Sequence, residues 1–159
     1  MTDLAGWAPN PHALVVHLPI GLLVTAVAGD LIGMLRRDPS TVVTISTGLY
    51  IAGTVTLIAA VLTGRSAAPE VYTPGLAQAI VARHWNLALW CVGYFGLLTA
   101  GRVGLQLAAE TPRRTSAVAL AAAGLAGLVL LTNTAELGAQ LVYQHGVGVA
   151  APVAGTTHD

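Results

Sequence analysis

Four long apolar segments constrain what this chain can fold into. A helix that crosses the hydrocarbon core of a bilayer needs about 20 mostly apolar residues, and residues 12–35, 41–63, 84–107 and 117–142 meet that length. Within lipid the backbone must satisfy its own hydrogen bonds, which selects helices for single segments. The sequence therefore predicts an all-α, four-transmembrane-helix bundle that forms one integral membrane domain over residues 1–159.

Composition agrees with a membrane location. Apolar residues make up 55% of the chain and charged residues 9%, against about 25% charged residues in soluble globular proteins. The formal net charge is zero, so we expect membrane lipid rather than nucleic acid as a partner. Lys is absent and Ala, Gly and Val are abundant, which is typical of a GC-rich bacterial genome. The single Cys91 excludes an intrachain disulfide and argues against thiolate ligation of a metal.

The connections between the apolar segments define the topology. Residues 36–40 and 108–116 are long enough only for turns, so the helices should form two antiparallel hairpins. Residues 64–83 are longer, and a short interfacial helix is predicted from residue 74 to residue 83. Residues 1–10 carry no basic side chain, whereas a signal peptide begins with a positively charged region. We therefore expect the first apolar segment to remain in the mature protein.

Basic residues predict the orientation. Of the six arginines outside the spans, four lie in the first and third connections and two, Arg65 and Arg83, lie in the second. Because cytoplasmic loops carry the excess of Arg and Lys, both termini should lie outside the cytoplasm of a bacterial inner membrane. Amphipathic aromatic rings, which anchor helices at a membrane boundary, are expected at the same outer side: Trp7, Tyr72, Trp85 and Tyr143.

The two hairpins share a spacing. His12 precedes Asp30 by 18 residues, and His84 precedes Arg102 by the same number. The same shift of 72 positions aligns further identical residues, Gly21 with Gly93 and Ala28-Gly29 with Ala100-Gly101. Duplication and chance in a chain rich in Gly and Ala both account for these matches.

Three ionisable residues within the spans require an explanation, because each costs about 2.5–3.5 kcal/mol on insertion scales. Asp30 and Arg102 lie at similar depth and are predicted to form a structural ion pair; an ion or proton path is the alternative. Glu136 is predicted to be a buried acid that is protonated or paired. Arg83, Arg65 or a protonated histidine could be its partner.

Four histidines are expected to converge at one membrane face. They are His12, His17, His84 and His145, and imidazole is a common ligand of transition metals and haem iron. All four are candidate metal ligands. His17, His84 and His145 are candidate haem ligands, with Arg83 or Arg65 balancing the propionates.

His17 is the first-ranked ligand, with His84 as its leading partner. His12 and His17 are about 140° apart around an ideal helix, so they should not share one ion. The simpler alternative for His17 is a hydrogen bond to Asn86 or to a backbone carbonyl.

At these residues the chain resembles a family of bacterial predicted four-helix membrane proteins of unknown function, of the domain-of-unknown-function 2231 type. The motifs that carry the resemblance are His12, Val16-His17-Leu18-Pro19-Ile20-Gly21, Asp30, His84-Trp85-Asn86 and Leu141-Val142-Tyr143-Gln144-His145-Gly146-Val147-Gly148-Val149. Ala13 and Leu18 replace the family's usual Pro and Phe, and Thr63-Gly64-Arg65 stands where the family tends to carry Asp-Trp. Similar domains occur fused to Rieske-type iron–sulfur domains, which implies a redox partner.

The sequence predicts a membrane redox or metal-binding protein, most concretely a b-type haem electron carrier that exchanges electrons with another membrane or redox protein. One alternative is a cofactor-free anchor or accessory subunit of a larger membrane complex. Another is a small proton or ion conductor built on Asp30, Arg102 and Glu136. The sequence shows no nucleophile with its base, no phosphate loop and no paired catalytic carboxylates, so a free-standing enzyme is not expected.

Overall fold

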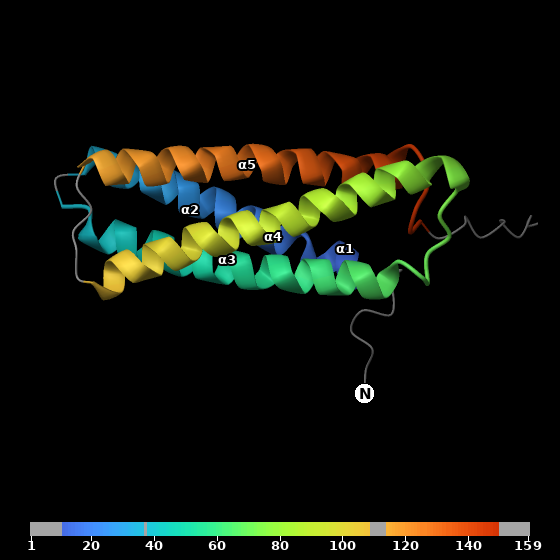
Figure 1. Cartoon of the computed structure of the whole chain (residues 1–159), viewed down its shortest axis with the longest axis horizontal. Helices are drawn as coiled ribbons and strands as arrows, with labels where there is room; N and C mark the ends of the chain where they lie inside the picture. The colour runs from blue at the N-terminus through green and yellow to red at the C-terminus, as the bar shows by residue number, and fades with distance from the viewer. Residues whose placement is uncertain (1–10, 37, 109–113, 150–159) are drawn as a thin grey trace, which may run out of the picture.

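The computed structural model describes residues 11–36, 38–108 and 114–149, and every regular element in these ranges is helical. The elements are α1 (Pro11–Val15), α2 (His17–Leu35), α3 (Ser40–Ala67), the 3-10 helix η1 (Gly75–Ala77), α4 (Gln78–Leu107) and α5 (Arg114–Tyr143) (Figure 1). They form four stretches long and apolar enough to cross a membrane. The predicted all-α bundle of four spans is confirmed. Trp7, Arg37, Arg113, His158 and both chain ends lie outside the described residues.

Three of the long helices extend beyond their predicted ends. α3 continues past Thr63 to Ala67, α4 begins at Gln78 rather than at His84, and α5 begins at Arg114 rather than at residue 117. The residues of the short interfacial helix predicted over 74–83 are helical from residue 75 onward, but they form η1 and the first six residues of α4 rather than a helix of their own. The physical reason is that Pro74 precedes the helix, where its missing N–H is harmless, and nothing after it breaks the helix. A 30-residue helix rises about 45 Å, so the ends of α4 and α5 project beyond a core about 30 Å thick.

The first span, predicted over residues 12–35, is interrupted near its start. α1 ends at Val15, and α2 begins at His17. Pro19 accounts for the break, because it lacks the N–H that would bond the carbonyl of Val15 four residues earlier, and its ring crowds that carbonyl. The histidines on either side of the break therefore belong to different helical segments.

The connection between α2 and α3 ends before Ser40, the first residue of α3. Asp38 accepts hydrogen bonds from the Ser40 hydroxyl at 2.7 Å and from the Ser40 backbone N–H at 3.1 Å. These two bonds, the side-chain bond first, hold the pKa of the Asp38 carboxyl below its usual value. A carboxylate at the first turn also complements the positive end of the helix dipole.

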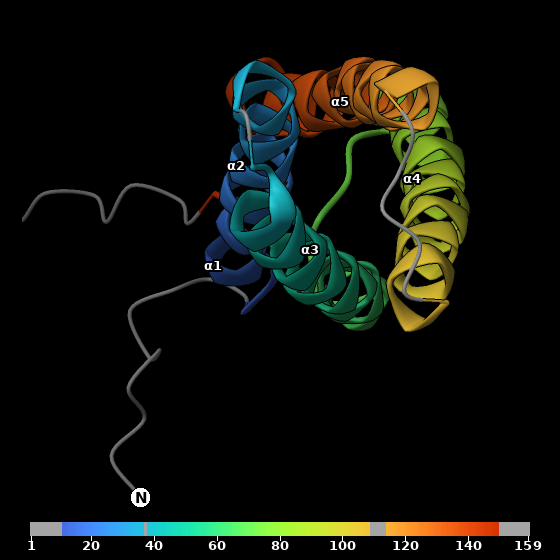
Figure 2. The same cartoon turned by 90° about the vertical axis from the view of Figure 1, so that its left-hand side faces the viewer.

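The helices form a four-sided bundle (Figure 2). α2 packs against α3 and α5, and α4 packs against the same two helices, so α2 and α4 are diagonal neighbours. Leu23, Phe95 and Cys91 are fully buried at the centre. Large apolar side chains cover the outside, with Leu97 79% exposed and Val129 64% exposed. An apolar exterior around an apolar core is what a bundle surrounded by lipid requires.

The two hairpins repeat the same packing. A Cβ atom on Gly53 would lie 2.7 Å from Cδ2 of Leu23, and one on Gly127 would lie 2.7 Å from Cζ of Phe95. Each α2 residue thus corresponds to the α4 residue 72 positions later, and each α3 residue to the α5 residue 74 positions later. The same two shifts pair further buried residues: Pro19 with Cys91, Thr47 with Ala121, Leu57 with Leu131 and Ala67 with Leu141. The hairpins are therefore parallel repeats related by a pseudo-twofold axis along the bundle.

Asp30 and Arg102 occupy equivalent positions in this repeat and meet inside the bundle. Nη1 of Arg102 donates to Oδ2 of Asp30 at 2.9 Å, and Nη2 donates to Oδ1 at 2.6 Å. Their side chains are only 6% and 3% exposed. Tyr50 donates its hydroxyl to Oδ2 at 3.1 Å, and the guanidinium carbon lies 4.5 Å from the centre of the Tyr50 ring. The ion pair that the matched spacing predicts is present, and Tyr50 completes it.

Removing one partner of this buried pair leaves an uncompensated charge. Asp30→Ala and Arg102→Ala should each lower the free energy of unfolding by about 3–5 kcal/mol. The double variant should lose clearly less than the sum of the two single losses. Denaturant unfolding in detergent micelles measures this, with Glu70→Ala, a change of an exposed carboxylate between α3 and η1, as the control. Additive losses would contradict the pairing.

Candidate functional site: a histidine pair at one end of the bundle

Two histidines are held in the same way in the two repeats. Nδ1 of His12 lies 2.9 Å from the carbonyl oxygen of Ala60 on α3, and Nδ1 of His84 lies 2.9 Å from the carbonyl oxygen of Thr134 on α5. Both contacts follow the shifts of 72 and 74 positions. A carbonyl oxygen can only accept, so Nδ1 must carry the proton in each ring. In a neutral imidazole the lone pair is then on Nε2.

A glycine one turn beyond each carbonyl receives the imidazole ring. A Cβ atom on Gly64 would lie 3.0 Å from Cε1 of His12, and one on Gly138 would lie 3.3 Å from Cε1 of His84. A larger residue at either position would push the ring aside. Each histidine is thus positioned twice by its neighbouring helix, through a hydrogen bond and through the space that a glycine leaves.

The two rings lie at the same end of the bundle, away from Asp30. Both are half-buried, and they occupy equivalent positions in the two repeats. Their surroundings are polar, since the Thr63 hydroxyl lies 3.4 Å from Nδ1 of His12 and the Thr134 hydroxyl lies 3.3 Å from Sγ of Cys91. Neither Nε2 atom has a hydrogen-bond partner among the described residues. The site therefore offers two imidazole lone pairs and few other ligands.

The ligand set is limited to this pair. Across the described ranges, no group of three or more His, Cys, Asp or Glu side chains is placed to hold a metal ion. Two imidazoles could hold haem iron, or a metal ion that takes further ligands from elsewhere.

The structure does not bring His17 to the other histidines. His17 is exposed, and its Nδ1 bonds the carbonyl oxygen of Ala13 in the preceding turn at 3.1 Å. The simpler prediction for His17 is a hydrogen bond to Asn86 or to a backbone carbonyl, and the bond to a backbone carbonyl is the one observed. Asn86 is exposed on α4. His145 follows the end of α5 and is half-buried. The break at Val16 places His12, rather than His17, on the inner side of the first span.

Glu136 is not a buried acid, and that prediction is wrong. It is exposed on the outer surface of α5, where Nε2 of Gln140 donates to its Oε1 at 3.3 Å. The reason is its direction: Thr134 points inward to Cys91, and a residue two positions later is about 200° around the helix. Arg65 and Arg83 are also exposed, and neither makes an ion pair with Glu136 in the part of the chain that the structure describes.

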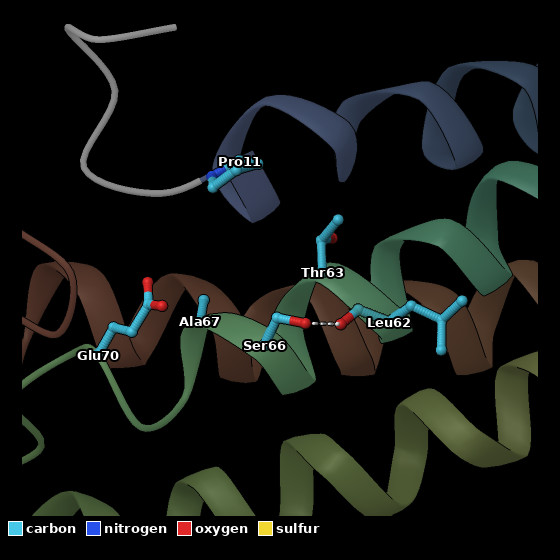
Figure 3. A pocket seen from close by; sticks show the side chains of 6 residues that line it. All are labelled: Pro11, Leu62, Thr63, Ser66, Ala67 and Glu70. Atoms are coloured by element: carbon cyan, nitrogen blue, oxygen red, sulfur yellow. Dashed lines mark hydrogen bonds between the residues drawn. The ribbon is translucent and has the colours of Figure 1, made fainter.

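A pocket lies beside the first turn of α1 (Figure 3). It has a volume of about 300 Å³ and is lined by Pro11, Leu62, Thr63, Ser66, Ala67 and Glu70. Pro11 faces Thr63 across it, and the Ser66 hydroxyl donates to the Leu62 carbonyl at 3.2 Å. No imidazole lines the pocket. It adjoins the histidine pair through Thr63, whose hydroxyl lies 3.4 Å from Nδ1 of His12.

Sequence reasoning missed the two residues that hold each ring in place. Backbone carbonyls carry no sequence signal, so Ala60 and Thr134 could not be identified. Gly64 and Gly138 could have been, because they align when a second shift of 74 positions is used for the second helix of each hairpin. The connection inside the second hairpin is two residues longer than that inside the first. An alignment of the two hairpins with one constant shift of 72 positions therefore does not align these two glycines.

Fold and site together define a multi-pass membrane protein made of two repeated helical hairpins, with a histidine pair at one end and a charged pair at the other. The family model described as "Predicted membrane protein (DUF2231)" matches residues 9–151. The chain belongs to this family, and the resemblance seen in its motifs is confirmed. Neither a curated protein nor a solved structure matches the chain.

Proposed function

We propose that this protein is a membrane redox or metal-binding protein in which His12 and His84 are the two protein ligands of a b-type haem iron, or failing that of a transition-metal ion. One observation carries the proposal: each imidazole donates Nδ1–H to a backbone carbonyl and keeps Nε2 free. Metal-ligating histidines usually donate their other ring N–H in this way, which fixes the tautomer and makes the ligand more basic.

The place of the pair in the fold supports the same function. Helix bundles build cofactor sites from side chains on facing helices. Here the ligands come from α1 and α4, one from each repeat. Arg65 follows Gly64 directly and is exposed, so it is the arginine we assign to balancing a propionate. Haem held by His12 and His84 would supply one-electron chemistry for exchange with redox partners at this end.

The interior argues against the ion conductor. Leu23, Leu57, Phe95 and Leu131 are buried between the histidine pair and the Asp30–Arg102 pair. Leu23 lies about 10 Å along the helix from Asp30. Conduction needs a path lined by polar groups, and an apolar layer separates the two polar ends.

The proposal predicts a chromophore that depends on two specific histidines. Protein expressed with ample haem and metals and purified in detergent should show a Soret band, which His12→Ala and His84→Ala should each abolish. His17→Ala is the matched control, because His17 is exposed and bonds its own helix, and it should keep the full band. Metal analysis of the same samples detects a bound metal ion that has no visible absorption.

Wild-type protein with neither haem nor metal would contradict the proposal and favour a cofactor-free anchor. Loss of the band in His17→Ala with retention in His12→Ala would contradict the choice of ligands. Helical circular dichroism of every variant separates loss of the cofactor from loss of the fold.

We further propose that the protein lies in a bacterial inner membrane with both termini and the histidine pair outside the cytoplasm. The distribution of arginines supports this. An export-dependent reporter fused at Asp159 should be active, and a cytoplasm-dependent reporter fused at Asp38 should be active. The reverse pattern would mean that the membrane orientation is opposite and that the histidine pair lies at the cytoplasmic face.

A further inference from the structure

The outer face of α5 carries polar side chains where lipid would require apolar ones. Asn133, Glu136 and Gln140 follow one another at spacings of three and four, so they share one face of the helix; we call them the α5 polar stripe. Asn133 and Glu136 are exposed and Gln140 is half-buried. Their hydrogen bonds stay within α5, from Asn133 Nδ2 to the Val129 carbonyl at 2.8 Å and from Gln140 to Glu136. None of the other described helices forms a hydrogen bond with these side chains.

The stripe lies inside the fourth candidate span, toward its C-terminal end. Glu136 is seven residues before Tyr143, which places it about 10 Å from the end of α5. Tyr143 is 87% exposed and is the kind of ring that marks a membrane boundary. An ionisable side chain at such depth normally faces protein and has a partner there. A protein surface is therefore expected to cover the stripe.

The chain itself carries a matching cation at the same depth. Arg83 is exposed on α4, beside α5. The next residue, His84, bonds Thr134 and packs on Gly138, two positions on either side of Glu136. Yet Arg83 and Glu136 form no ion pair within the chain; among the described residues the ion pair seen is Asp30–Arg102.

We propose that a second copy of this chain covers the α5 polar stripe, in a twofold dimer in which Glu136 of each copy pairs with Arg83 of the other. A twofold axis along the membrane normal keeps every residue at its own depth. Equal depth of Glu136 and Arg83 is thus a condition of such a dimer, and the structure meets it. An isologous interface forms the pair twice.

The rest of the stripe suits a copy of itself. The amides of Asn133 and Gln140 carry both donors and acceptors, and such groups hydrogen-bond across helices in lipid. This inference rests on α4 and α5 and does not depend on a cofactor at the histidine pair. A His12→Ala variant should dimerise like the wild type, which separates failure of the two proposals.

Reversal of the charges at Glu136 and Arg83, singly and in a mixture of the two variants, tests the pairing. Copies labelled with donor or acceptor dyes are reconstituted in phosphatidylcholine vesicles, and energy transfer is followed as lipid is added. The wild type should associate, and Glu136→Arg and Arg83→Glu alone should each associate about tenfold more weakly, because like charges then meet. A mixture of the two variants should recover wild-type association, since every Glu then faces an Arg.

Arg36→Glu, a change of an exposed arginine at the other end of the bundle, is the control. It should associate like the wild type and should not rescue Glu136→Arg. Wild-type protein that remains monomeric, single variants that associate normally, or a mixture that does not recover would each overturn the proposal. If a charge-reversed variant does not fold by circular dichroism, Glu136→Gln and Arg83→Gln replace the pair, and unchanged association of both would overturn it.

Discussion

A bilayer supplies no hydrogen-bond partners, so each polar side chain inside a span must find one within the protein. The arrangement of this bundle follows from that constraint. Asp30 and Arg102 neutralise one another, with Tyr50 on the same carboxylate. The hydroxyls of Thr54 and Thr99 bond each other at 2.9 Å, and the two inner histidines bond carbonyls of neighbouring helices. Where polar groups remain on the lipid side, as on α5, the same constraint calls for another protein surface.

Because the chain contains an internal repeat, polar residues inside the bundle occur in pairs at equivalent positions of the two hairpins. Residues at equivalent positions of α2 and α4 come together near the pseudo-twofold axis. At one end the equivalent positions hold opposite charges, Asp30 and Arg102, which stabilise the joint between the hairpins. At the other end they hold the same residue, His12 and His84, which offers two identical ligands. Duplication of one hairpin followed by divergence at single positions would produce both arrangements.

The sequence was sufficient to predict the number of spans, their pairing into hairpins and the contact between Asp30 and Arg102. Length and hydropathy define spans, and matched depth defines which charges can meet. The direction of a side chain around its helix was harder to predict. In water an apolar stripe reveals the inward face, but in lipid both faces are apolar. The sequence therefore predicts the position of Glu136 along α5 but not the side of the helix that carries it.

The choice among the histidines failed for a related reason. His12 and His17 lie within one predicted helix, and their relative directions depend on whether that helix is continuous. The break before Pro19 changes those directions, and the carbonyls that select His12 and His84 leave no trace in side-chain identity. The family match extends over nearly the whole chain and supports the fold, while the geometry of the two rings supports the site.

The central claim is that His12 and His84 form one site in which both rings present an unprotonated Nε2. The most direct measurement is nitrogen NMR of protein labelled with ¹⁵N-histidine, in lipid at neutral pH and without cofactor, with His12→Ala and His84→Ala used to assign the signals. The account predicts that both residues show a protonated, hydrogen-bonded Nδ1 and a bare Nε2, and that both Nε2 signals change when haem is added. A protonated Nε2 on either ring, or a response to haem from one ring alone, would contradict it.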